Sequence, residues 1–221
     1  MQNPTQKQSL IFISGFGGNQ KIYQKSLNTI KNNFDIFAID FTRPLKTKDL
    51  TIKSFADSIH QFIIKNKIKN PIIIGHSFGG AVSMAYGLYY ENYQQIILLN
   101  PVGLIPLNFK KIIIGLLAGE KILLKSAGLK MVTVFVNNIF SHPVWSLKKI
   151  KIIKKLHFKE NEASRIQNLK IIFSDKDAHF PLKEILKLPK NLNIKIIKGA
   201  HEWPILEPTK FKEIIQKTCQ N

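Results

Sequence analysis

The stretch PIIIGHSFGGA, residues 71–81, places a serine between glycines directly after an apolar run. A short apolar run that opens with a proline is typical of a buried strand. Residues 75–79 match the pattern G-x-S-x-G, in which the serine occupies a tight strand-to-helix turn and its hydroxyl projects above the sheet. Taken alone, five residues also fit a glycine-rich turn with an incidental serine. The apolar run before the motif and the helical pattern after it favour Ser77 as a nucleophile.

Short apolar runs and amphipathic segments alternate on both sides of this motif. Because the runs are apolar on both faces, they predict a mostly parallel sheet covered by helices on both sides, an α/β fold. In such sheets the chemistry lies at the carboxyl ends of the strands. The predicted strands are 10–14, 34–41, 71–75, 95–100, 169–174 and 193–197, and the predicted helices are 20–32, 51–68, 81–90 and 211–219.

The alternation breaks once, between Pro101 and Leu169. A loop of this length without secondary structure is exceptional in a compact domain. We therefore predict a helical cap insertion over residues 102–168, set into a core formed by residues 1–101 and 169–221. Within it, residues 145–156 place isoleucines on one helical arc and lysines on the opposite arc, although Leu147 and Lys149 violate the division.

A serine nucleophile needs a base, and the base needs an orienting acid. Asp175 and Asp177 follow the strand 169–174, and His201 follows the strand 193–197. The order serine, acid, histidine is the order that nucleophile-elbow folds use. An oxyanion would be held by two backbone N–H groups, and Phe16 and Phe78 are placed to supply them.

The glycine-rich loop at residues 14–19, SGFGGN, also invites a comparison with phosphate-binding loops. A dinucleotide fingerprint that begins at Gly15 requires a third glycine where this chain has Gln20. The Gly-Lys-Ser/Thr ending of a Walker loop is missing from it too. We therefore expect no nucleotide cofactor. The spacing of His, Cys, Asp and Glu along the sequence suggests no metal site either.

Together these motifs resemble the α/β-hydrolase fold superfamily, in its small cap-bearing esterase/lipase-like branch. The resemblance covers nearly the whole chain through SGFGG, GHSFGG, SDKDAHFP and GAHEWP. It implies Ser77 as nucleophile, His201 as base and an acid after the penultimate strand. The family's Gly-x-x-Asp loop aligns with residues 174–177, which favours Asp177 over Asp175. Ser14 stands where the family usually has a histidine.

The expected reaction is cleavage of a carboxylic ester or thioester of a small acyl substrate, without a cofactor. The same residues also serve C–C bond, amide or peroxide chemistry in relatives, and the fold alone does not separate these reactions. A non-catalytic module that binds a ligand or a membrane is a further alternative. Phe135, Phe140 and Trp145 are candidates to line the substrate pocket, and packing within the cap is the other interpretation of each.

The chain has 33 Lys and Arg residues against 14 Asp and Glu residues, a net charge of +19. Only Arg43 and Arg165 are arginine, whereas nucleic-acid readers rely on arginine, so we expect no nucleic-acid partner. The lysine excess reflects either compositional bias or weak association with an anionic membrane surface. The single cysteine, Cys219, and the apparent lack of a signal peptide or transmembrane run predict a cytoplasmic protein. The sequence does not indicate the oligomeric state.

Overall fold

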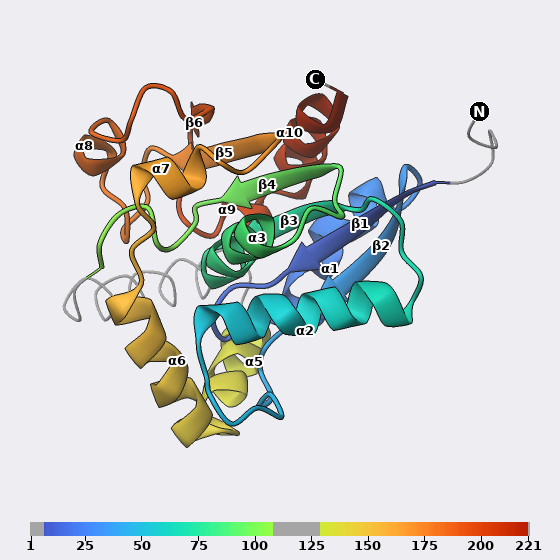
Figure 1. Ribbon diagram of the computed structural model, residues 1–221, viewed down its shortest axis with the longest axis vertical. Helices are drawn as coiled ribbons and strands as arrows, with labels where there is room; N and C mark the ends of the chain where they lie inside the picture. Colours follow the sequence, from blue (N-terminus) through green and yellow to red (C-terminus); the bar gives the residue numbers. More distant parts are fainter. Residues whose placement is uncertain (1–6, 108–128, 221) are drawn as a thin grey trace.

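The computed structural model describes residues 7–107 and 129–220. Its described strands form one sheet in the order β2-β1-β3-β4-β5-β6, and every neighbouring pair is parallel (Figure 1). The α/β fold predicted from the alternating apolar runs is therefore confirmed. The strands are β1 (Gln8–Ile13), β2 (Phe34–Ile39), β3 (Ile72–His76), β4 (Gln95–Leu99), β5 (Leu169–Ser174) and β6 (Ile194–Ile197).

The sheet separates two apolar clusters, one on each face. Along β1 the side chains alternate: Leu10 and Phe12 join one cluster, and Ile11 and Ile13 join the other. Helices α1 (Gln20–Ile30) and α10 (Pro208–Gln220) cover the first face, with the short helix α9 (Trp203–Leu206) between them. Helices α2 (Ile52–Lys65) and α3 (Phe78–Tyr89) cover the second face. Burial on both faces explains why the central strands are apolar throughout.

The starts of the first two helices are encoded locally. Asn19 caps α1 by accepting hydrogen bonds from the backbone N–H groups of the next turn. Thr51 and Ser54 form a reciprocal capping box at the start of α2. One face of α2 then buries Phe55, Ile59 and Ile63, as their helical spacing predicts.

Three described helices lie in the predicted insertion between β4 and β5: α5 (Leu129–Phe140), α6 (Pro143–Lys155) and α7 (Glu160–Ala163). The apolar and basic segment 109–125 falls outside the described residues. The limits of the cap, 102 and 168, therefore stay a prediction. A short helix, α8 (Leu182–Ile185), follows β5.

Figure 1 shows α5 and α6 at the end of the molecule opposite β6 and α10. No helix in the described part of the chain combines the length and the apolar character that a bilayer crossing requires.

Candidate active site

Ser77 occupies a strained turn between β3 and α3. Its backbone has φ 54° and ψ −116°, a conformation that residues other than glycine rarely adopt. The crowding around the turn explains the flanking glycines. A Cβ atom on Gly75 would lie 2.2 Å from the carbonyl oxygen of Gly79, and one on Gly79 would lie 2.1 Å from that of Ile13. The motif G-x-S-x-G therefore satisfies a steric requirement of the strand-to-helix turn.

Asp177 and His201 form a buried hydrogen-bonded pair. The Asp177 Oδ2 atom lies 2.6 Å from Nδ1 of His201, and both side chains are almost fully buried. The other carboxylate oxygen accepts from the N–H groups of His179, at 2.7 Å, and Phe180, at 3.0 Å. Because an ionised carboxylate only accepts hydrogen bonds, Nδ1 of His201 carries the proton. The Nε2 atom of that tautomer has a free lone pair and can act as a base.

The surroundings of His201 tune its pKa. Burial alone lowers the pKa of this imidazole, but the charge and the hydrogen bond of Asp177 outweigh burial and raise it above the ordinary value. Glu202 adds to the rise. The neighbouring imidazole of His179 lies 4.5 Å away, ring centre to ring centre. Burial, followed by the charge on His201, lowers the pKa of His179 to about 3, so His179 is neutral at ordinary pH.

Asp175 has a different partner. Its carboxylate accepts a hydrogen bond of 2.9 Å from the N–H of Gly199, which connects the loops after β5 and β6. Of the two aspartates proposed from the sequence, Asp177 is the one that touches His201.

A hydrogen-bond chain that the sequence did not reveal joins three loops at this edge of the sheet. The N–H of Gly15 donates to the Tyr23 hydroxyl at 3.2 Å, and that hydroxyl lies 2.7 Å from Nδ1 of His76. The Nε2 atom of His76 lies 3.0 Å from the backbone carbonyl oxygen of His201. Because a carbonyl oxygen only accepts, Nε2–H of His76 donates to it and Nδ1 accepts from Tyr23.

The Tyr23 and His76 side chains in this series of hydrogen bonds are both neutral. Burial, followed by the nearby His201, lowers the pKa of His76 well below its ordinary value, and burial raises the pKa of Tyr23. No sequence signal pairs Tyr23 with His76, because they lie in separate elements and only the fold brings them together.

Asn100 directly follows β4 and is hydrogen-bonded to the loop that carries His201. Its side-chain amide donates to the Ser174 hydroxyl at 2.9 Å and to the carbonyl oxygen of His201 at 3.1 Å. Its side-chain oxygen accepts from the backbone N–H of Ser174 at 2.8 Å. The position of His201 is therefore fixed from both β4 and β5.

The two predicted oxyanion donors flank Ser77. Phe78 follows it at the start of α3, and Phe16 follows Gly15, where an added Cβ atom would lie 3.2 Å from the Cβ of Ser77. Within the described residues, neither the Phe16 nor the Phe78 N–H donates a hydrogen bond. The hydrogen bonds of the described residues likewise include none between the Ser77 hydroxyl and His201.

The three residues predicted to line a substrate pocket occupy different environments. Phe135 contacts the loop that carries Phe16: a Cβ atom on Gly17, whose φ is +71°, would lie 2.7 Å from the Phe135 ring. Trp145 is a core residue instead, because its ring packs on Phe55 and its indole N–H donates to the carbonyl of Phe41 at 2.9 Å.

Phe140 is 71% exposed at the end of α5. The contacts of Trp145 fit the packing interpretation of this residue, and the exposure of Phe140 gives the pocket interpretation no support there. The substrate-pocket roles of these residues stay predictions.

Lys149 is the unexpected residue of α6. Its side chain is almost fully buried, and its amine donates to the carbonyl of Phe41 at 2.7 Å. The amine lies 4.9 Å from the centre of the Phe16 ring. Burial lowers the pKa of this amine to about 8, although nearby Asp40 opposes the change. Helical phase, rather than charge, explains its position, because Lys149 lies on the same face of α6 as Trp145 and Ile153.

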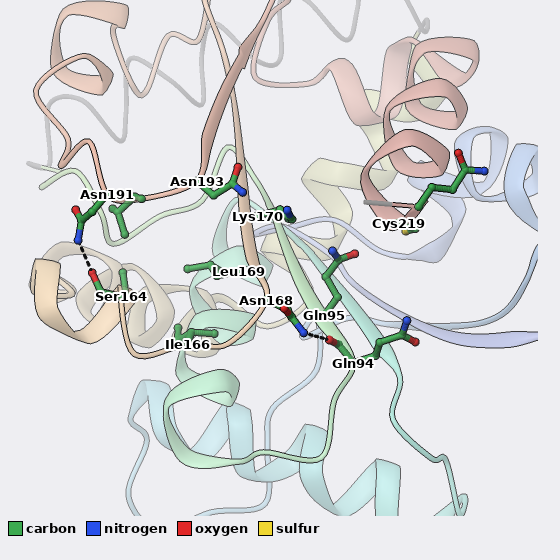
Figure 2. Close-up of a pocket in the computed structure, with 13 residues that line it drawn as sticks. Gln94, Gln95, Ser164, Ile166, Asn168, Leu169, Lys170, Asn191, Asn193 and Cys219 are labelled. Atoms are coloured by element: carbon green, nitrogen blue, oxygen red, sulfur yellow. Dashed lines mark hydrogen bonds between the residues drawn. The ribbon is translucent and has the colours of Figure 1, made fainter.

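A polar pocket of about 550 Å³ lies at the opposite edge of the sheet, where β4 and β5 begin (Figure 2). Amide side chains surround it, and Asn168 donates to the carbonyl of Gln94 at 3.0 Å. This pocket is separate from the site at Ser77, which lies where β3 ends. No group of His, Cys, Asp and Glu residues within the described ranges could hold a metal ion.

Comparisons with known proteins identify the family of this fold. The family described as alpha/beta hydrolase fold matches residues 8–126. A Mycoplasma genitalium protein named "Putative esterase/lipase 2" is 25% identical over 92% of this chain and 74% of its own length. A rice protein named "Probable 1-acylglycerol-3-phosphate O-acyltransferase" is 30% identical over 43% of this chain, which spans only 25% of that relative's length.

The enol-lactonase structure from Burkholderia xenovorans superposes with a TM-score of 0.80 at 11% identity, over 98% of this chain and 92% of its own. This likeness shows a shared fold. With the family match over more than half of the sequence, it leads to one conclusion: the chain belongs to the alpha/beta hydrolase fold family.

Proposed function

We propose that this protein is a serine hydrolase that cleaves a carboxylic ester or thioester. The observation that carries the proposal is the buried Asp177–His201 pair at the edge of the sheet where Ser77 occupies its strained turn. The His76 imidazole connects the serine turn with the histidine loop through the carbonyl of His201. The relative named for esterase and lipase activity, which aligns with 92% of this chain, supports ester bonds as the substrate class.

In the first half of the reaction, the Ser77 hydroxyl attacks the carbonyl carbon of the substrate. His201 Nε2 takes the hydroxyl proton, and Asp177 stabilises the imidazolium that forms. The N–H groups of Phe16 and Phe78 hold the oxyanion of the tetrahedral intermediate. The carbon–oxygen or carbon–sulfur bond then breaks, the leaving group departs with the proton from His201, and an acyl group stays on Ser77.

In the second half, a water molecule attacks the acyl-enzyme. His201 takes a proton from that water and returns it to the Ser77 oxygen as the acid departs. The net change is addition of one water across the ester bond. In this proposal His201 carries out every proton transfer of both halves.

The test is turnover of chromogenic acyl esters by the wild-type protein and by Ser77→Ala. The expected result is ester hydrolysis that the substitution reduces by roughly 10⁴–10⁶-fold, because removal of one member of a unit-acting triad disables the covalent step. Thermal unfolding of both proteins checks that the fold is kept. Wild-type-like turnover in the folded Ser77→Ala variant, or turnover only of amide or C–C bond substrates, would count against the proposal.

A further inference from the structure

Three large apolar side chains are exposed at the corner where α5 ends and α6 begins. The exposed fractions are 71% for Phe140, 65% for Val144 and 59% for Leu147. This corner lies at the extremity of the molecule in Figure 1, away from β6 and α10. Single exposed apolar residues are common, whereas three exposed within eight residues at one corner suggest an interaction site.

Four lysines continue the same surface along α6: Lys148, Lys151, Lys154 and Lys155 are all exposed. At about 100° per residue, they share an arc of roughly 120° with Val144 and Leu147. None of the ion pairs among the described residues involves these lysines. The sequence has no Asp or Glu between Glu120 and Glu160, so this arc carries no acidic side chain. We call the four lysines and the three apolar residues the docking face.

A groove of about 450 Å³ borders the docking face. Its apolar walls come from residues at the start of α2 and at the C-terminal end of α6, and three of the four lysines also line it. An apolar groove with a cationic rim suits a molecule that has an acyl chain and an anionic headgroup. The groove is lined by Leu50, Thr51, Ile52, Lys148, Lys151, Ile152, Lys155 and Leu156.

The opposite side of α6 fixes this helix to the core. The Trp145 indole and the Lys149 amine both donate to the carbonyl oxygen of Phe41, at 2.9 and 2.7 Å. The docking face is therefore presented on a helix that is already packed, and no folding is needed before it binds.

We propose that the docking face binds the surface of an anionic phospholipid bilayer. Phe140, Val144 and Leu147 enter the boundary between headgroups and acyl chains, and the lysines contact the headgroup phosphates. This partner accounts for both halves of the surface. A nucleic acid would satisfy the lysines but leave the three apolar side chains without a role.

The test is sedimentation of the full chain with vesicles. The protein should co-sediment with vesicles of phosphatidylcholine and phosphatidylglycerol and should bind at least about tenfold more weakly to pure phosphatidylcholine. Raising the salt concentration should release it, because exposed charges are screened beyond ~8 Å at physiological ionic strength. Equal binding to both vesicle types, or no binding to either, would overturn the proposal.

Two sets of variants locate the contact. Replacing Lys148, Lys151, Lys154 and Lys155 with Gln should reduce anionic-vesicle binding by at least about tenfold. The matched control replaces Lys21, Lys25, Lys65 and Lys69 with Gln: these lysines are exposed on α1, α2 and the loop after α2, and their loss changes the net charge equally. The control should keep most of the binding. If both sets lose binding equally, the net charge explains it and the docking face does not.

The apolar half is tested separately. Replacing Phe140, Val144 and Leu147 with Gln should weaken vesicle binding, whereas Ile64→Gln, at a position 60% exposed on α2, should not. Thermal unfolding of every variant confirms that the fold is kept. Competition by duplex DNA is measured for the wild type and for the apolar variant. If the two proteins bind vesicles equally and DNA displaces both equally, the surface recognises polyanions and the bilayer proposal is wrong.

Discussion

Asp175 and Asp177 lie two residues apart in the loop after β5, but their carboxylates have different partners. Asp177 contacts the imidazole of His201, and Asp175 accepts from the N–H of Gly199. Asp177→Asn should lower kcat/KM for an ester by about 10⁴-fold, because an amide there favours the wrong histidine tautomer. Asp175→Asn keeps an acceptor oxygen for the N–H of Gly199 and should lower kcat/KM far less. Steady-state kinetics on both variants makes the comparison. A larger loss of kcat/KM in Asp175→Asn would show that Asp175, and not Asp177, orients the histidine.

The pKa of His201 gives the proposed reaction a defined pH dependence. The base must be neutral, so kcat/KM should increase with pH through the pKa of His201. Asp177 holds this pKa above the ordinary value of 6.5, so the midpoint of the rise should lie above pH 6.5. In Asp177→Asn the midpoint of the rise should lie at a lower pH than in the wild type, because burial still lowers the pKa of His201 and the main influence that raises it is gone. A pH profile with the same midpoint in both proteins would show that His201 is not the titrating base.

Lys149 should make the stability of the protein depend on pH. Its pKa is about 8 in the folded chain against 10.5 when unperturbed. Between these values the unfolded chain binds more protons than the folded chain, so the free energy of unfolding increases as pH rises. The Lys149→Met variant lacks this increase, because it has no amine at this position.

Denaturant unfolding of both proteins at several pH values measures the gain. From pH 7.5 to 9.5, the free energy of unfolding of the wild type should rise relative to that of Lys149→Met by about 1–2 kcal/mol. A constant difference between the two proteins would mean that the Lys149 amine is not held in a desolvated environment.

At the scale of elements, α5 contacts the loop that carries Phe16. The Phe135 ring lies against Gly17, and the Asn138 amide donates to the carbonyl of Gly17 at 3.0 Å. Phe135→Ala should therefore change the preferred acyl length of the substrate, because long esters depend on apolar contact at ~0.8 kcal/mol per buried CH₂. Phe140→Ala, in the exposed last turn of the same helix, is the matched control and should leave the preference unchanged.

The measurement is kcat/KM across a C2–C12 ester series for the wild type and both variants. An equal loss at every chain length in Phe135→Ala would assign its ring to holding the loop rather than to contacting the substrate. A changed profile in Phe140→Ala would place the substrate at the outer end of α5.

At the scale of the whole molecule, the sequence predicts elements better than contacts between them. The strand preceding Ser77 and the loops of Asp177 and His201 could be predicted, because apolar runs and turn residues encode them locally. The hydrogen bond between Tyr23 and His76 joins α1 to the end of β3, and no local pattern reports such a pairing. The helical phase of Lys149 places it on the apolar arc of residues 145–156, but the pattern does not reveal that its amine is buried and hydrogen-bonded to Phe41, because lysines rarely bury.

The central claim is that Ser77 is an activated nucleophile, and labelling with a fluorophosphonate probe tests it most directly. The probe reacts with a serine whose hydroxyl proton is removed by a base, so the wild type should be labelled at one site within residues 71–81. Ser77→Ala should take up no probe, and Asp177→Asn should react far more slowly. A folded wild-type protein that takes up no probe, or one labelled equally in Ser77→Ala, would contradict the account.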